Sequence, residues 1–183
     1  MERLAQFLRD RRGSALIEIA FSIPILMILL TGIVETGIFL MLNQKLQHTA
    51  VAISDLTTRD EEIDQATMDD IFNAAPLIME PFAMAAKARV FVTAAGNDSG
   101  GNPTIFWQRT GAGSLLQASG IGMEGGVPTL PPDIPLRDNE TLVVTEVYYE
   151  YQPVFFSVID PVRLRRTAFH RPRIGALQAI GGD

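Results

Sequence analysis

The chain has 183 residues, 47% of them hydrophobic, and a formal net charge of −6 at pH 7, which together predict one modest domain attached to a membrane segment. An acidic chain lacks the basic surface that binds nucleic acid, so the composition argues against a nucleic-acid partner. The absence of cysteine excludes disulfides and thiolate metal sites.

A long apolar segment runs from Ala15 to Leu42, and the stretch Ile19 to Val34 within it holds no charged residue. As a helix rising about 1.5 Å per residue, Ala15 to Leu42 would be roughly 42 Å long, which exceeds the ~30 Å of bilayer hydrocarbon. We therefore predict a transmembrane helix over residues 14–42 that protrudes from the bilayer and contacts lipid. The arginines before it predict a cytoplasmic N-terminus, with residues 43–183 as a domain on the outer side.

Two glutamates, Glu18 and Glu35, lie within this apolar segment, where an ionised side chain is costly. Glu35 lies near the outer end of the segment. We expect it to reach the interface or to make a secondary intramembrane contact, with a neighbouring subunit or with Lys45.

The residues around Glu18 form a recognisable pattern. Arg11-Arg12-Gly13, followed by Ser14 to Glu18, resembles the processing site of type IV prepilins and pseudopilins. The resemblance implies that residues 1–13 are a basic leader and that a prepilin peptidase cuts between Gly13 and Ser14. It also implies that Glu18, the fifth residue after that cut, takes part in subunit pairing.

Physical chemistry supports a role for Glu18 after such a cut. Cleavage would leave a new α-amino group on Ser14, with a pKa near 8 and hence a positive charge at neutral pH. Residues i and i+4 are neighbours on one helix face, and a carboxylate near a helix N-terminus also meets the positive end of the helix dipole. Glu18 can therefore neutralise the amine of its own chain or, as the resemblance implies, that of an adjacent subunit.

Further segments extend this resemblance to one family. They are Pro24 within the span, Gly32 to Gly37 (GIVETG), Phe91 to Arg109, Thr145 to Phe155 (TEVYYEYQPVF) and the tail Arg171 to Arg173. The chain resembles the TadE-like proteins of the Flp, or tight-adherence, pilus. The resemblance implies a pseudopilin-like inner-membrane protein with a periplasmic C-terminal domain. Its implied partners are the prepilin peptidase, the major pilin, other pseudopilins and the inner-membrane platform.

Other readings of the N-terminal segment remain open. An unprocessed signal anchor could carry a periplasmic binding or interaction domain. A secretory signal peptide could be cleaved after Ala52, in the small-x-small sequence Ala50-Val51-Ala52. Arg11-Arg12 is also a weak match to a twin-arginine export signal.

Beyond the membrane, the pattern predicts two helical regions. Apolar and small residues recur at steps of three and four, which extends the first helix to about Thr57; they are Leu42, Leu46, Thr49, Ala50, Ile53 and Leu56. Thr67 is the predicted N-cap of a second helix that ends before Pro81. We expect Pro76 to kink or split that helix.

The rest of the chain predicts antiparallel strands. Residues 89–93 and Ile105 to Gln108 form a hairpin across the turn Gly96 to Pro103. Leu142 to Tyr151 is the clearest strand, with Glu146 and Tyr148 on one face, and Arg163 to Phe169 is its expected partner. The predicted class is α+β, pilin-like, with the second helix packed on the sheet.

No motif indicates an enzyme, a metal or a cofactor. Only His48 and His170 are present, too few for a histidine metal cluster. The G-x-G-x-x-G match that begins at Gly120 has no strand before it and is predicted to be a loop. Asp98 is predicted to stabilise a turn. The tyrosines 148, 149 and 151, with Trp107, are either core residues or a partner surface.

Overall fold

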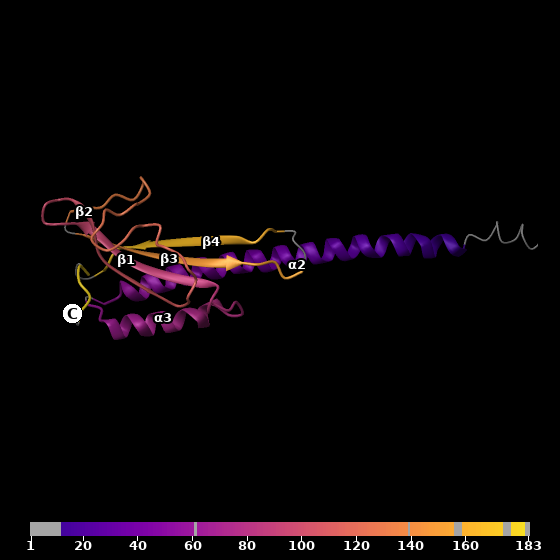
Figure 1. Ribbon diagram of the computed structural model, residues 1–183, viewed down its shortest axis with the longest axis horizontal. Coiled ribbons are helices and arrows are strands. Elements are labelled where there is room, and N and C mark those ends of the chain that lie inside the picture. Colours follow the sequence, from indigo (N-terminus) through magenta and orange to yellow (C-terminus); the bar gives the residue numbers. More distant parts are fainter. Residues whose placement is uncertain (1–11, 61, 139, 156–158, 174–176, 182–183) are drawn as a thin grey trace, which may run out of the picture. The chain divides into compact units, whose positions relative to one another are not determined.

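A computed structural model describes residues 12–60, 62–138, 140–155, 159–173 and 177–181 (Figure 1). They form two helices, α2 (Arg12–Thr57) and α3 (Gln65–Met79), and four strands, β1 (Ala88–Asn97), β2 (Pro103–Gly111), β3 (Thr141–Tyr151) and β4 (Val162–His170). The strands make one antiparallel sheet in the order β2-β1-β3-β4. The predicted α+β class is confirmed.

The chain divides into two compact units. The first contains Met1–Phe39 and Pro153–Asp160, which is the beginning of α2 together with part of the connection between β3 and β4. The second contains Leu40–Gln152 and Pro161–Asp183, with the end of α2, helix α3 and the sheet.

In the first unit, α2 has the character of a membrane span. Of the helices in the described residues, it is the one long and apolar enough to cross a bilayer, with a mean hydropathy of 2.3 and none of its most apolar window buried in the protein. Three hydroxyl groups of this part of α2 are satisfied within the helix. Ser22, Thr31 and Thr36 each donate to the carbonyl four residues earlier, at 2.7, 2.8 and 2.8 Å. Such bonds remove the polar groups that lipid cannot solvate.

In the second unit, α2 buries the predicted stripe with one exception. Leu42, Leu46, Thr49, Ala50 and Ile53 are fully buried. The prediction for Leu56 is wrong, because its side chain is 37% exposed while Ser54 and Thr57 are buried. The stripe steps by four residues from Ile53 to Thr57, which turns Leu56 away from the core.

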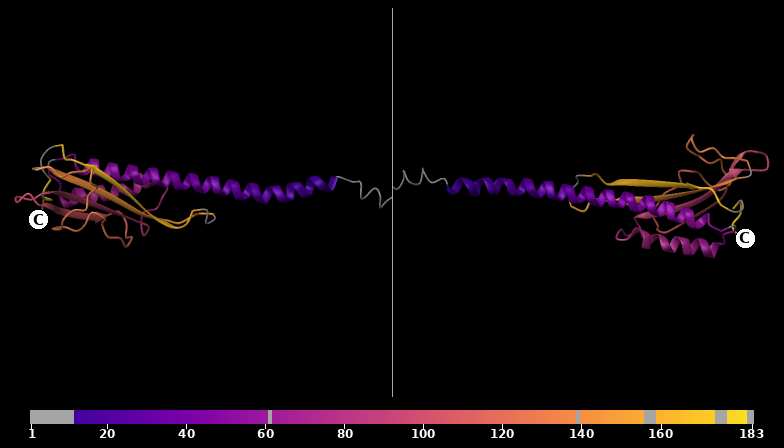
Figure 2. Two further views of the ribbon diagram at one scale, coloured as in Figure 1. Left: turned by 90° about the horizontal axis from the view of Figure 1, so that it is seen from above. Right: turned by 180° about the vertical axis from the view of Figure 1, so that it is seen from behind.

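Helix α3 begins one turn earlier than predicted. Asp64, not Thr67, is the N-cap, because its carboxylate accepts the backbone N–H of Thr67 at 2.7 Å. Hydrogen bonds from the side chain and the backbone of Thr67 lower the pKa of Asp64. The helix also continues through Pro76 as one element, so Pro76 does not split it. Figure 2 shows helix α3 on one side of the sheet. Helix and sheet pack closely, since a Cβ built on Gly111 in β2 would lie 2.5 Å from the Phe72 ring.

The sheet matches the prediction in its pairings. β1 and β2 form the hairpin, with a register shift between Ala94 and Ala95, and β3 pairs with β4 so that Glu146 lies opposite Thr167. β3 is buried along almost its whole length. The segment between β2 and β3 covers one face, where Ile121 packs in a cluster with Ala95, Ile105, Leu142 and Val144.

Candidate functional site

The predicted processing site lies at the start of α2. The backbone at Gly13 and Ser14 is helical, and the Glu18 side chain is exposed. Glu18 is one helical turn from Ser14, as the proposed pairing requires. Residues 1–11 of the predicted leader, including Arg11, lie outside the described residues. Cleavage after Gly13 and subunit pairing through Glu18 therefore stay predictions.

Glu35 has a partner that the sequence analysis did not find. Its carboxylate is fully buried and accepts the backbone N–H of Val154 at 3.1 and 3.0 Å and that of Phe155 at 3.0 Å. Lys45, one of the expected partners, instead donates to the carbonyl of Ile78 at 3.1 Å. No local signal links Glu35 to residues 119 and 120 positions away.

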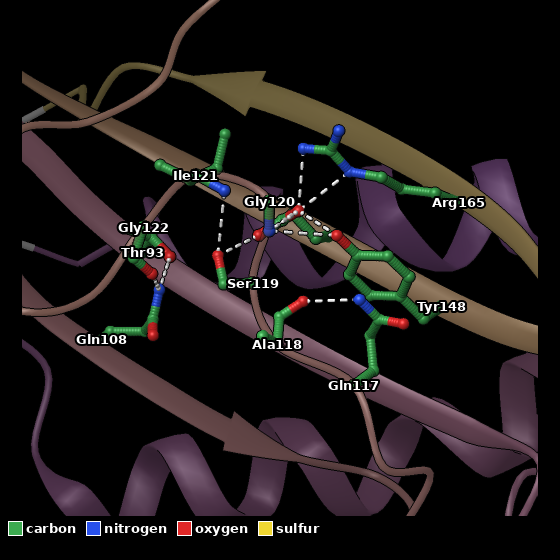
Figure 3. Close-up of polar contacts among 11 residues, drawn as sticks. Thr93, Gln108, Gln117, Ala118, Ser119, Gly120, Ile121, Gly122, Tyr148 and Arg165 are labelled. Atoms are coloured by element: carbon green, nitrogen blue, oxygen red, sulfur yellow. Dashed lines mark hydrogen bonds and ion pairs between the residues drawn. The ribbon is translucent and has the colours of Figure 1, made fainter.

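A second buried glutamate, Glu146, organises a polar cluster on β3. Figure 3 labels its partners Ser119, Gly120, Tyr148 and Arg165. The Arg165 guanidinium on β4 lies 2.8 Å from its carboxylate, and the Tyr148 hydroxyl donates to it at 2.8 Å. From the segment between β2 and β3, the Ser119 hydroxyl and the Gly120 N–H, at 3.0 Å, also donate. Donors from three parts of the chain thus satisfy one buried charge, as burial of a carboxylate requires.

The absence of a side chain at Gly120 allows this close packing. A Cβ at this position would lie 2.8 Å from the Arg165 guanidinium carbon and 3.0 Å from the Tyr148 hydroxyl. The G-x-G-x-x-G match is therefore a loop, as predicted, and its first glycine gives the backbone close access to Glu146.

Burial and the neighbouring Glu146 carboxylate raise the pKa of Tyr148 to about 12. Both effects disfavour the phenolate. Tyr148 therefore stays a neutral hydrogen-bond donor across the physiological pH range. The tyrosines of β3 and Trp107 are all buried, which confirms the core reading over an exposed partner patch.

Asp98 has a structural role. The Asp98 carboxylate accepts the N–H groups of Gly100 and Asn102, both at 2.8 Å, which confirms the predicted turn. These bonds lower the pKa of Asp98. His48 is exposed on α2 and His170 ends β4. Within the described ranges, no group of three or more histidine, aspartate or glutamate residues is arranged to hold a metal.

One motif of the sequence contributes to both buried glutamates. Thr145 to Phe155 supplies Glu146 and Tyr148 to the cluster in the second unit, and its last two residues bind Glu35 in the first. Alternation along the strand placed Glu146 and Tyr148 on one face. The sequence analysis did not predict the network, although Glu146 shares its face with the apolar Val144, a pattern that could have indicated a buried carboxylate.

An apolar helix that can span a bilayer, joined in sequence to a helix-and-sheet unit, defines a membrane-anchored α+β protein. Residues 13–53 match the family model of TadE-like proteins, in agreement with the resemblance found in the sequence. The match contains Gly13, Glu18 and Glu35 and ends before the sheet. No curated protein and no solved structure matches the chain.

Proposed function

We propose that this chain is a pseudopilin-like membrane protein of Flp, or tight-adherence, pilus assembly, and that a prepilin peptidase processes it after Gly13. The observation that carries the proposal is the TadE-like match, which begins at Gly13 and includes Glu18. The exposed apolar surface of α2 supports it, because a helix released from its leader must remain in lipid or pack beside other helices.

In this proposal the arginine-rich side of the span stays in the cytoplasm and the second unit lies in the periplasm. The membrane is then the bacterial inner membrane. The partners are the prepilin peptidase, the major pilin, other pseudopilins and the inner-membrane platform. The exposed Glu18 carboxylate is available to pair with the new amine of a neighbouring subunit.

We also propose that the role is structural and not enzymatic. The most elaborate polar cluster, around Glu146, is filled by donors from its own chain. A general acid or base needs access to a substrate proton. Glu146 is fully buried, so it offers none.

Cleavage is tested by expressing the full chain with an active prepilin peptidase and sequencing the N-terminus of the membrane-extracted protein. We expect the mature chain to start at Ser14. Gly13→Leu should retain the leader, because a bulky side chain obstructs the close approach of the protease to the backbone. The control Gly32→Leu lies in the same helix, where an added Cβ meets no atom within 4 Å, and should be processed normally.

Other outcomes have defined meanings. A start at Met1 beside an active peptidase would contradict processing and favour the unprocessed signal anchor that carries a periplasmic interaction domain. A start after Ala52 would favour export. In the same strain, Glu18→Ala should insert normally but impair processing or filament assembly. Glu18→Asp keeps the carboxylate, so it should retain part of that processing or assembly. Normal pili from Glu18→Ala would remove the pairing role.

A further inference from the structure

The connection between β3 and β4 presents an unusual combination of groups at Glu35. The backbone N–H groups of Val154 and Phe155 are bound to the buried carboxylate at 3.0 to 3.1 Å. Their side chains do not share that burial, since Val154 is 62% and Phe155 is 53% exposed. The backbone N–H groups of this turn are thus satisfied by Glu35, while its apolar side chains are exposed.

The helix is apolar at the same level, on the faces that turn away from this contact. Ile33 is 69% exposed and Val34 is 42% exposed, immediately before Glu35. These residues belong to the same unit as Val154 and Phe155. In water, exposed apolar side chains on both the turn and the helix would be unfavourable, and apolar surface of this extent marks a contact with a partner or a membrane.

The position of Glu35 along the span favours the membrane, and not a protein partner, as the contact of these apolar side chains. The charge-free stretch Ile19 to Val34 is about 24 Å long as a helix, and centring it in ~30 Å of hydrocarbon places its ends roughly 3 Å inside the boundary. Glu35 then lies at that boundary. Val154 and Phe155, which are hydrogen-bonded to Glu35, lie at the same depth.

We propose that residues 153–155 form a second membrane contact, in which Val154 and Phe155 insert among the acyl chains where the span leaves the bilayer. Glu35 holds these residues in place through its hydrogen bonds to their backbone, and we call this contact the Glu35 clamp. The chemistry on each side supports the other. Backbone N–H groups that enter lipid need acceptors within the protein, and a carboxylate at that depth needs donors. The contact satisfies both and leaves only apolar side chains facing the hydrocarbon.

The proposal is tested with the full chain in vesicles of phosphatidylethanolamine and phosphatidylglycerol, without pilus proteins. The result is therefore independent of the proposed pilus function. Because the chain has no cysteine, Phe155→Cys can be labelled at one site with an environment-sensitive fluorophore. The matched control is Leu116→Cys, an 88% exposed leucine in the segment between β2 and β3.

We expect nitroxide groups on the lipid acyl chains to quench the label at position 155 severalfold more than the label at position 116. Stronger quenching at 155 by aqueous iodide than by lipid nitroxides would overturn the proposal. The proposal would also be overturned if the label at position 155 were protected from both quenchers and this protection increased with the ratio of protein to lipid. That result would indicate that a second copy of the chain covers these residues.

The clamp is tested by adding Glu35 substitutions to the labelled Phe155→Cys chain. Glu35→Ala removes both acceptor oxygens and should reduce lipid quenching severalfold, whereas Glu35→Gln keeps one carbonyl acceptor and should reduce it less. Glu18→Ala, at the other end of the charge-free stretch, should leave it unchanged. Unchanged Trp107 emission would show that the second unit is folded. If the Glu35→Ala chain showed the same lipid quenching at position 155 as the chain with Glu35, the role of Glu35 in holding this turn would be contradicted.

Discussion

Glu146 and Glu150 lie on the same strand, and each pairs with an arginine of β4 in a different environment. Glu146 is fully buried with Arg165 at 2.8 Å, whereas Glu150 is 43% exposed with Arg163 at 3.9 Å. A buried carboxylate that loses its charge leaves several aligned donors poorly satisfied, while an exposed pair is screened by water.

We therefore expect Glu146→Gln to lower the free energy of unfolding by roughly 2 to 4 kcal/mol. The matched control Glu150→Gln should change it by less than about 0.5 kcal/mol. Urea unfolding of the detergent-solubilised chain, followed by the emission of its one tryptophan, measures both. Equal effects of the two substitutions would contradict the structural role of the Glu146 cluster.

Tyr148 makes the stability of the same cluster depend on alkaline pH. The folded state holds the phenolic proton up to a pKa of about 12, whereas an unfolded tyrosine releases it at about pH 10. Between these values the folded state binds more protons, so the free energy of unfolding falls as pH rises, and the contribution is complete below about pH 10. Urea unfolding across this range should show a shallower decline for Tyr148→Phe, and equal slopes would contradict the assignment.

At the scale of the elements, local pattern predicted most of the fold. Alternation identified β3 and separated its two faces, and the turn residues between Gly96 and Pro103 placed the first hairpin. The beginning of α3 was misplaced because Asp64 and Thr67 are both good caps, three residues apart. The covering of the sheet by the segment between β2 and β3 was not predicted, since that segment has no periodicity and is held by contacts distant in sequence.

The chain after β4 is another element whose packing has no local signal. The Trp107 indole on β2 donates to the carbonyl of Leu177 at 2.8 Å, and both side chains are buried. Leu177→Asp would place a charge at a buried position whose backbone carbonyl binds the tryptophan, and it should shift the Trp107 emission to longer wavelength and cost roughly 2 to 3 kcal/mol of stability. The neighbouring control Gln178→Asp changes an exposed residue and should do neither. A normal Leu177→Asp spectrum would contradict the packing of this segment.

At the scale of the whole molecule, sequence reasoning located the candidate membrane and processing residues but missed how Glu35 is satisfied. Gly13, Ser14 and Glu18 lie within six residues and form a local motif, so they can be read from the chain. Glu35 depends on a turn that comes after three strands of the sheet. An acid in an apolar helix indicates that a partner exists, but only the fold identifies it.

The most apolar residues of α2 should determine whether the whole chain stays in the membrane. Leu26 and Leu30 are more than half exposed on α2 and are neighbours on one helix face. Changing both to Asp should cost about 5 to 7 kcal/mol of membrane insertion and move much of the protein into the soluble fraction after alkaline carbonate extraction. The control, Leu116→Asp with Met123→Asp, changes two highly exposed apolar residues of the second unit and should leave the protein in the membrane pellet. Retention of the Leu26 and Leu30 double variant in that pellet, at the wild-type level, would show that α2 is not what holds the chain in the bilayer.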